Sequence, residues 1–271
     1  MKKMKKLFFV FFAVSLLTAA WPVNAAASFS YMPSASGKVL NGWNGNYYYV
    51  NGRKVTGLKK IDGRFYYFNA KGVLQKNKAA FKITVGSTVR YYNINAKGIA
   101  IRLTGTQELA AARLVALGAN LNTITPAKQL AALKKAFLWS AQIKYRSMTG
   151  SVSAADAPAY YGNYGFKTGR GDCRVQAYTF YWMAKVLGYK PAYIYGYVPR
   201  AKVNGRYTNF ATHAWCTIKF DGVKYVFDPN FNTSSDAAKY RVQNQYIGFK
   251  FRYGAKHTYA YHNANKRLLT A

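Results

Sequence analysis

Residues 171–188 have the sequence GDCRVQAYTFYWMAKVLG. An aspartate directly before an apolar-rich run is a good helix N-cap, and glycine after such a run is a common C-terminal stop. We therefore predict a buried helix over residues 173–187, capped by Asp172 and closed by Gly188. Cys173 would then lie in the first turn, where the positive end of the helix dipole favours a thiolate.

Three strands are predicted after this helix. They span residues 192–198, 212–220 and 223–228, and the last two are joined by Asp221-Gly222, a strong hairpin-turn dipeptide. A helix followed by antiparallel strands predicts an α+β domain.

His213 and Asp228 fall on the two strands of this hairpin. His213 follows Cys173 by 40 residues, and Asp228 follows His213 by 15. Because paired strands run side by side, the carboxylate is expected to reach the imidazole edge and set its tautomer. A thiol, an imidazole and a carboxylate are the parts of an activated cysteine nucleophile. Cys173, His213 and Asp228 are therefore the candidate catalytic nucleophile, base and orienting group, in a chain with only 2 Cys and 3 His.

A disulfide between Cys173 and Cys216 is the alternative that the two cysteines of the chain raise. Strand side chains alternate between faces, and Cys216 lies three positions from His213, so these two face opposite sides. If His213 faces Cys173, Cys216 does not, which disfavours the disulfide. The same argument disfavours a metal shared by His213 and Cys216, and His257 and His262 lack ligand spacing. We predict no metal site and no cofactor.

The N-terminus predicts export. Four lysines lie within the first six residues, an apolar run follows over residues 7–20, and small residues surround Ala25. This is the pattern of a secretory signal peptide, and the run is shorter than the about 20 residues of a membrane span. We predict a signal peptide at 1–25 and a linker at 26–38, with no transmembrane span after cleavage. An uncleaved anchor is the alternative.

The chain is strongly basic. It has 40 Lys and Arg against 7 Asp and Glu, a formal charge of +33 that falls to +29 without the four lysines of the leader. Such a charge favours polyanionic partners. For an exported protein we expect an anionic cell-wall polymer or glycan rather than nucleic acid, and a secreted protein retained at the cell wall or cell surface.

Residues 39–103 contain an aromatic repeat. YYYVNGRKV at 47–55 recurs as FYYFNAKGV at 65–73 and, more weakly, as YYNINAKGI at 91–99. Each unit has aromatic strand formers, an Asn/Gly/Lys turn and a β-branched residue, which predicts a β-hairpin. Units of about 20 residues cannot bury a core alone and are expected to stack.

These units resemble the cell-wall-binding, choline-binding-like repeats of exported Gram-positive proteins. The resemblance rests on Gly42-Trp43 and on the Tyr-Tyr-Phe-Asn core at 66–69, whereas the second unit has Gly57-Leu58 in place of Gly-Trp. It implies that aromatics of adjacent hairpins hold a ligand, with cation–π attraction for a quaternary ammonium. The alternative is that they form only a β-solenoid core. The candidate ligand-binding residues are Trp43, Tyr48, Tyr49, Tyr66 and Tyr67.

The catalytic candidates lie in motifs that resemble the transglutaminase-like superfamily. In order, these are Gly-Asp-Cys at 171–173, Leu-Gly-Tyr-Lys-Pro-Ala at 187–192, Gly-Tyr-Val at 196–198, His-Ala-Trp at 213–215 and Asp-Pro at 228–229. The resemblance covers about residues 127–231. It implies a catalytic domain at 104–271 with a papain-like core, in which the helix bearing the Cys packs on an antiparallel sheet. It also implies thiol acyl transfer by Cys173, His213 and Asp228: transamidation, deamidation or amide hydrolysis of a protein or peptide.

Other parts of this domain are less informative. Helices are predicted at 108–117 and 127–145, a loop at 151–168, and either strands or a peripheral tail at 232–271. The oxyanion would be held by the Cys173 backbone N–H and a second donor, for which Trp139, Gln142 and Tyr145 are candidates.

Three functions are consistent with these patterns. The first is an exported transglutaminase-like cysteine acyltransferase or amide hydrolase, and the second is a cysteine peptidase, which differs in its acyl acceptor. The third is a non-catalytic, adhesive wall-binding protein whose triad is idle.

Overall fold

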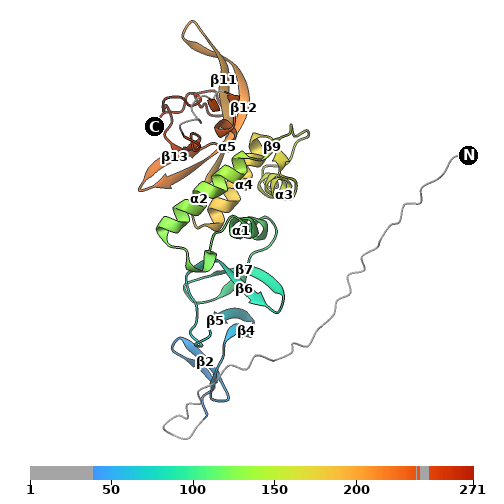
Figure 1. The fold of residues 1–271 in the computed structure, drawn as a ribbon, viewed down its shortest axis with the longest axis vertical. Helices are drawn as coiled ribbons and strands as arrows, with labels where there is room; N and C mark the ends of the chain where they lie inside the picture. The colour runs from blue at the N-terminus through green and yellow to red at the C-terminus, as the bar shows by residue number, and fades with distance from the viewer. Residues whose placement is uncertain (1–38, 236, 239–243) are drawn as a thin grey trace, which may run out of the picture.

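A computed structural model describes residues 39–235, 237–238 and 244–271; the predicted signal peptide and linker lie outside them. The described chain is elongated, with β-hairpins at one end, helices in the middle and the largest sheet at the other end (Figure 1). The predicted α+β class is confirmed. None of the described helices is both long and apolar enough to cross a bilayer.

The aromatic repeats form three small antiparallel sheets. Their strands are β1 (Gly42–Asn44), β2 (Tyr47–Val50), β3 (Arg53–Lys54), β4 (Gly57–Ile61), β5 (Arg64–Phe68), β6 (Lys78–Val85), β7 (Thr88–Ile94) and β8 (Ala100–Arg102). The second and third sheets are joined by a bridge between Tyr66 of β5 and Ile99, the residue directly before β8.

The repeated asparagine builds the turn of the repeat. Asn69 accepts hydrogen bonds from the backbone N–H groups of Lys71 and Val73 through its side-chain oxygen, and Asn95 makes the same pair of bonds two residues and four residues ahead. This Asx-type turn explains why Asn-Ala-Lys-Gly recurs in the sequence.

Four helices connect the repeats to the main sheet. Thr125 caps the second helix, since its hydroxyl accepts from the N–H of Lys128, and Pro126 lies in the first turn. The second helix ends at Ala141 rather than at residue 145. The helices are α1 (Thr106–Ala116), α2 (Pro126–Ala141), α3 (Ala157–Thr168) and α4 (Cys173–Val186), with a short 3-10 turn, η1 (Leu121–Thr123).

The prediction of a loop over residues 151–168 was wrong, because α3 occupies most of it. Glycines in this segment serve close packing rather than flexibility. A Cβ at Gly165 would lie 2.4 Å from the Thr179 side chain and 2.7 Å from the Val175 side chain, both on α4. Small residues therefore allow α3 to approach α4 closely. Helix propensity did not indicate this, because glycine is unfavourable in an isolated helix.

The main sheet has four antiparallel strands in the order β11-β12-β13-β14, and the helix bearing Cys173 packs on it, as predicted. Phe180 of α4 stacks on Phe227 of β13 with ring centroids 5.2 Å apart. The C-terminal segment supplies the last strand, which resolves the open question about residues 232–271. The strands are β11 (Ala192–Val203), β12 (Arg206–Phe220), β13 (Val223–Phe227) and β14 (Phe249–Phe251).

The first two strands of this sheet are longer than predicted. Beyond Val198 they continue as a two-stranded ribbon, residues 199–210, which we call the arm (Figure 1). The prediction stopped before Pro199, but β11 is an edge strand, where proline is tolerated. Asn204 and Gly205, both at positive φ, close the arm.

Candidate active site

The N-terminal turn of α4 holds Cys173 beside a neutralised carboxylate. Asp172 caps the helix by accepting from the Arg174 N–H at 3.0 Å. The Arg174 side chain returns to the same carboxylate, with Nη2 2.7 Å and Nε 2.9 Å from Oδ2. This two-point ion pair sets the negative charge of Asp172 against a cation, so it opposes a neighbouring thiolate less than a free carboxylate would.

His213 and Asp228 form a short buried pair. The Nε2 atom of His213 lies 2.6 Å from Oδ2 of Asp228, and the side chains are 5% and 0% exposed. The strand register explains the contact: Cys216 pairs with Phe227, so His213 and Asp228 fall diagonally on the same face. The two residues that the hairpin pattern relates are thus brought together.

Asp228 accepts three hydrogen bonds. Besides His213, the Tyr261 hydroxyl donates to Oδ2 at 2.7 Å, and the Phe231 N–H donates to Oδ1 at 2.9 Å. The last bond caps α5 (Pro229–Asn232), which begins immediately after Asp228. The carboxylate is therefore fixed by a helix N-terminus, a strand residue and a residue from the C-terminal segment.

This environment makes His213 a cation at neutral pH. Burial alone would lower its pKa, but the adjacent Asp228 carboxylate and its hydrogen bond, with a smaller contribution from Cys173, raise it to about 10. Cys173 and His213 line the same cleft, and the thiol is close enough to the imidazole to contribute to its raised pKa. Because Nε2 faces Asp228, Nδ1 is the ring nitrogen left for Cys173. Thiol, imidazole and carboxylate are thus contiguous.

Cys216 is free and buried, and so is not bridged to Cys173. Its thiol donates to the Ala177 carbonyl of α4 at 3.3 Å, whereas Trp215, the next residue on the His213 side, packs against Tyr261. The predicted opposition of His213 and Cys216 is confirmed. Cys216 nevertheless packs against the cysteine-bearing helix, one turn beyond Cys173. Burial raises the pKa of the Cys216 thiol.

A cleft of about 350 Å³ opens over Cys173 and His213. A second hollow of about 460 Å³ adjoins it, and Tyr145 and Asn230 line both. The other residues of the first, which we call the active-site cleft, are Val198, Pro199, Arg200, Ala211, Thr212 and Tyr259.

The three oxyanion candidates lie in different places. Tyr145, on β9 (Lys144–Tyr145), borders Cys173 across the active-site cleft. Trp139 stacks on Phe166 with ring centroids 5.6 Å apart, and Gln142 is exposed at the C-terminus of α2. Of the three, Tyr145 is the one that the fold brings to the thiol.

Comparison with known proteins assigns the region that carries these residues. Residues 118–229 match the family model of the transglutaminase-like superfamily. This segment is a transglutaminase-like domain. The match and the contiguous thiol and imidazole together support a cysteine-based enzyme. No curated protein matches the chain.

Two solved structures are similar to parts of the chain. One is the choline binding domain of Spr1274 in Streptococcus pneumoniae, with 27% identity over 23% of this chain and 75% of that chain, at a TM-score of 0.19. The other is a candidate cysteine protease from Cytophaga hutchinsonii, with 18% identity over 47% of this chain and 39% of that chain, at a TM-score of 0.29.

Sequence reasoning missed several residues of the transglutaminase-like domain and its surroundings. Buried Gln176 donates to the Ile143 carbonyl and accepts from the Asn230 side chain at 2.7 Å, so it ties the β9 loop to the residue that follows Asp228-Pro229. Gln176 could have been predicted to lie near the site, because it is on the same helix as Cys173 and one turn after it. Tyr261 lies outside the matched region and carried no local signal.

The repeat aromatics separate into two groups. Trp43, which is 43% exposed, lies edge-on to Tyr48 and Tyr66 with ring centroids 5.2 Å and 5.1 Å away. Tyr49 is buried, and Tyr67 packs on Phe81 of the next sheet at 5.2 Å. The structure therefore gathers three of the five candidates, whereas Tyr49 is buried and Tyr67 lies between two sheets.

Proposed function

We propose that this chain is an exported, cell-surface enzyme that transfers acyl groups from amide bonds of a protein or peptide through Cys173, His213 and Asp228. The observation that carries the proposal is the 2.6 Å contact between buried His213 and Asp228, next to the half-buried thiol at the start of α4. A cation on His213 stabilises a thiolate on Cys173, and the thiolate is the nucleophilic form.

Acylation would proceed in two steps. The Cys173 thiolate attacks the amide carbonyl carbon and forms a C–S bond, which places negative charge on the carbonyl oxygen. The intermediate then collapses, the C–N bond breaks, and the His213 imidazolium gives its Nδ1 proton to the leaving amine. The products are a thioester on Cys173 and neutral His213.

Deacylation would reverse these roles. An amine or a water attacks the thioester carbon and loses a proton to His213, and the C–S bond breaks to regenerate the Cys173 thiolate. Asp228 stays ionised throughout and keeps the Nε2–H of His213 directed away from the thiol. Transamidation follows from an amine acceptor, and deamidation or hydrolysis from water.

The oxyanion would be held by the N–H of Cys173 and by Tyr145. The Asp172 carboxylate accepts the N–H groups of Arg174 and Val175, which leaves the Cys173 N–H as a first-turn donor beside the active-site cleft. The Tyr145 side chain is 71% exposed and free to turn toward a bound substrate.

Retention at the cell surface would come from the repeats and the basic charge. The exposed Trp43 with Tyr48 and Tyr66 offers an aromatic surface for a wall ligand, and the charge of +29 that remains without the four leader lysines attracts anionic wall polymers. The competing hypothesis is an adhesive protein whose triad is idle. The reactivity of the Cys173 thiol distinguishes the two hypotheses.

Alkylation with iodoacetamide tests the proposal directly. At pH 6 we expect the native protein to be labelled at Cys173 alone, and faster than the denatured chain, because His213 is charged at this pH. Buried Cys216 is an internal control in the same sample, and a His213→Ala variant should lose the rate advantage. A native Cys173 that reacts no faster than denatured protein would refute the enzyme reading.

Incorporation of an amine probe tests the acceptor. Covalent transfer of the probe onto a protein substrate by the wild type, and not by Cys173→Ala, would favour transamidation. Release of ammonia or a new peptide end without incorporation would favour deamidation or a cysteine peptidase.

A further inference from the structure

The arm carries positive charge onto the catalytic face of the sheet. His213 pairs with Gly196, and Ala211 pairs with Val198. Because strand side chains alternate, Arg200, two residues beyond Val198, is on the same face as His213. Arg200 is exposed and lines the active-site cleft together with Cys173.

A second group of cations lies on the other element that borders the thiol. Lys144 of β9 pairs with Arg170 of β10 (Arg170–Gly171), directly before the turn that holds Cys173. The N–H of Arg146 donates to the Gly171 carbonyl at 2.9 Å. All three cationic side chains are exposed, but none of them lines the active-site cleft, so Arg200 is the cation that the cleft itself contains.

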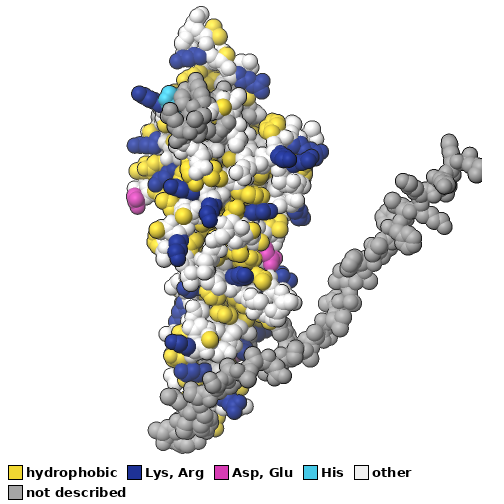
Figure 2. All heavy atoms as spheres, viewed as in Figure 1, with side chains coloured by type: hydrophobic (Ala, Val, Ile, Leu, Met, Phe, Trp, Pro, Cys, Tyr) yellow, Lys and Arg dark blue, Asp and Glu magenta, His cyan; other side chains and the backbone are white. Residues whose placement is uncertain are grey.

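No exposed carboxylate offsets these cations among the residues that the structure describes around the cleft. Asp172 is held by Arg174, and Asp228 is fully buried against His213. Figure 2 shows how sparse acidic side chains are on one face of the molecule compared with Lys and Arg. None of the remaining described acids lines the active-site cleft; these are Asp62, Glu108, Asp156 and Asp221.

We propose that the active-site cleft selects acyl donors that carry a carboxylate close to the scissile amide, and that Arg200 is the residue that binds this carboxylate. The guanidinium fork matches a carboxylate in two-point geometry. This inference rests on the proposed function, since it names the substrate class of the same site. Arg200 is a specificity residue, and the thiol chemistry itself does not depend on it.

A pair of alkylating agents measures this preference without a known substrate. Iodoacetate and iodoacetamide deliver nearly the same group to a thiolate, with loss of iodide in both cases, but only iodoacetate carries a carboxylate. The measured quantity is the rate ratio of iodoacetate to iodoacetamide at Cys173. We expect the ratio in native protein to exceed that of the denatured chain, and to fall as added salt shortens the Debye length from about 30 Å at 0.01 M to about 3 Å at 1 M.

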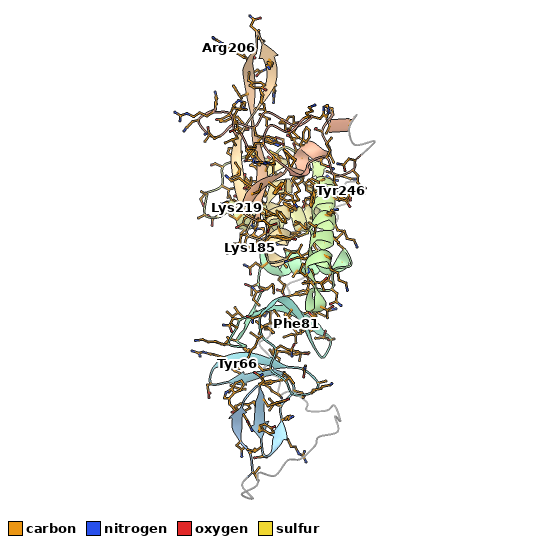
Figure 3. All side chains as sticks on the ribbon, turned by 90° about the vertical axis from the view of Figure 1, so that its left-hand side faces the viewer. Tyr66, Phe81, Lys185, Arg206, Lys219 and Tyr246 are labelled. Carbon is orange, nitrogen blue, oxygen red and sulfur yellow. The ribbon has the colours of Figure 1, made fainter. Side chains whose placement is uncertain are left out.

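Variants separate Arg200 from other sources of attraction. Arg200→Ala should lower the ratio about three-fold, the size of one exposed ion pair, and Arg200→Lys should restore part of it. The imidazolium of His213 attracts iodoacetate in every variant, so it does not contribute to the difference in rate ratio between a variant and the wild type. Lys219→Ala is the matched control, because it removes an exposed positive charge from β12, the strand that also carries His213. Figure 3 shows Lys219 at the opposite end of this strand from Arg206, which lies at the end of the arm.

Two outcomes overturn the inference. An unchanged ratio in Arg200→Ala would show that Arg200 does not contact the anion, and an equal drop in Lys219→Ala would show a diffuse effect of net charge. Circular dichroism of each variant confirms that it is folded. The salt dependence of the rate ratio is measured on the wild type alone, so this test does not require that any variant folds. Failure of the proposed function is distinguishable, because Cys173 would then react slowly with iodoacetamide as well.

Discussion

Substituting Asp228 by Asn isolates the buried ion pair at the centre of the site. The change keeps the size of the side chain and one acceptor oxygen, which can still take the Phe231 N–H that Oδ1 accepts in the wild type. It replaces Oδ2, the atom that accepts from the Tyr261 hydroxyl and contacts His213, by an amide NH2, and it removes the negative charge next to His213. Without that charge, burial dominates and the pKa of His213 falls below its ordinary value of 6.5. The imidazole is then neutral at pH 7, and Cys173 loses the neighbouring cation.

The expected loss of stability in Asp228→Asn, and the pH range over which it changes, follow from the raised pKa of His213. The pKa of His213 is about 10 in the folded wild type, against its ordinary value of 6.5. A raised folded-state pKa stabilises the fold fully below pH 6.5, and this stabilisation is lost as the pH rises toward 10, at up to about 1.4 kcal/mol per pH unit. Removing one partner of a buried pair costs about 3–5 kcal/mol. We therefore expect Asp228→Asn to be about 3–5 kcal/mol less stable at pH 6.

Urea denaturation at pH 6, 7.5 and 9 tests this expectation, with tryptophan fluorescence and circular dichroism recorded on the same samples. The stability difference between wild type and Asp228→Asn should narrow by about 3 kcal/mol between pH 6.5 and 9. Other alkaline titrations, such as that of buried Cys216, are present in both proteins and cancel in the difference. A difference that stays constant across this range would refute a charged His213 in the folded state.

Three further substitutions test separate parts of the molecule. Tyr261→Phe removes the hydroxyl that donates to Asp228 and keeps the ring against Trp215, so urea denaturation should show a loss of about 1.5–3 kcal/mol; an unchanged midpoint would contradict the bond. Gly165→Ala places a Cβ 2.4 Å from the Thr179 side chain, and we expect thermal unfolding to report a loss of about 1–3 kcal/mol. Trp43→Ala should lower retention on purified Gram-positive cell walls while the alkylation rate of Cys173 stays the same; equal retention would leave the repeats as a structural stack only.

The part of the site that sequence could predict is the part that local geometry controls. Asp172 as helix cap and Cys173 in the first turn follow from capping chemistry, and the approach of His213 to Asp228 follows from strand alternation across a short turn. Alternation also placed Cys216 opposite His213. It could not say which face packs on α4, because that depends on the tertiary position of the helix.

The features that could not be predicted from the sequence depend on long-range packing. Tyr261 reaches Asp228 from 33 residues away, out of a segment whose composition gave no regular pattern. The helix over residues 157–168 was mistaken for a loop because Gly165 is unfavourable in an isolated helix, and only its contact with α4 explains it. The arm was missed because Pro199 is compatible with an edge strand, and the sequence does not reveal which strand is the edge.

The same long-range contacts explain why the site extends past residue 229, where the transglutaminase-like match ends. His262 exchanges two backbone hydrogen bonds with Tyr197 of β11, at 2.8 Å and 2.9 Å, and this pairing positions Tyr261 over Trp215 and Asp228. A Cβ at Gly196 would lie 2.3 Å from the His262 carbonyl oxygen, so the glycine next to Tyr197 is what admits the C-terminal segment. The Gly-Tyr-Val motif thus acts on the candidate site indirectly: it allows the C-terminal segment to cover Asp228 and exclude water, which strengthens the charge pair with His213.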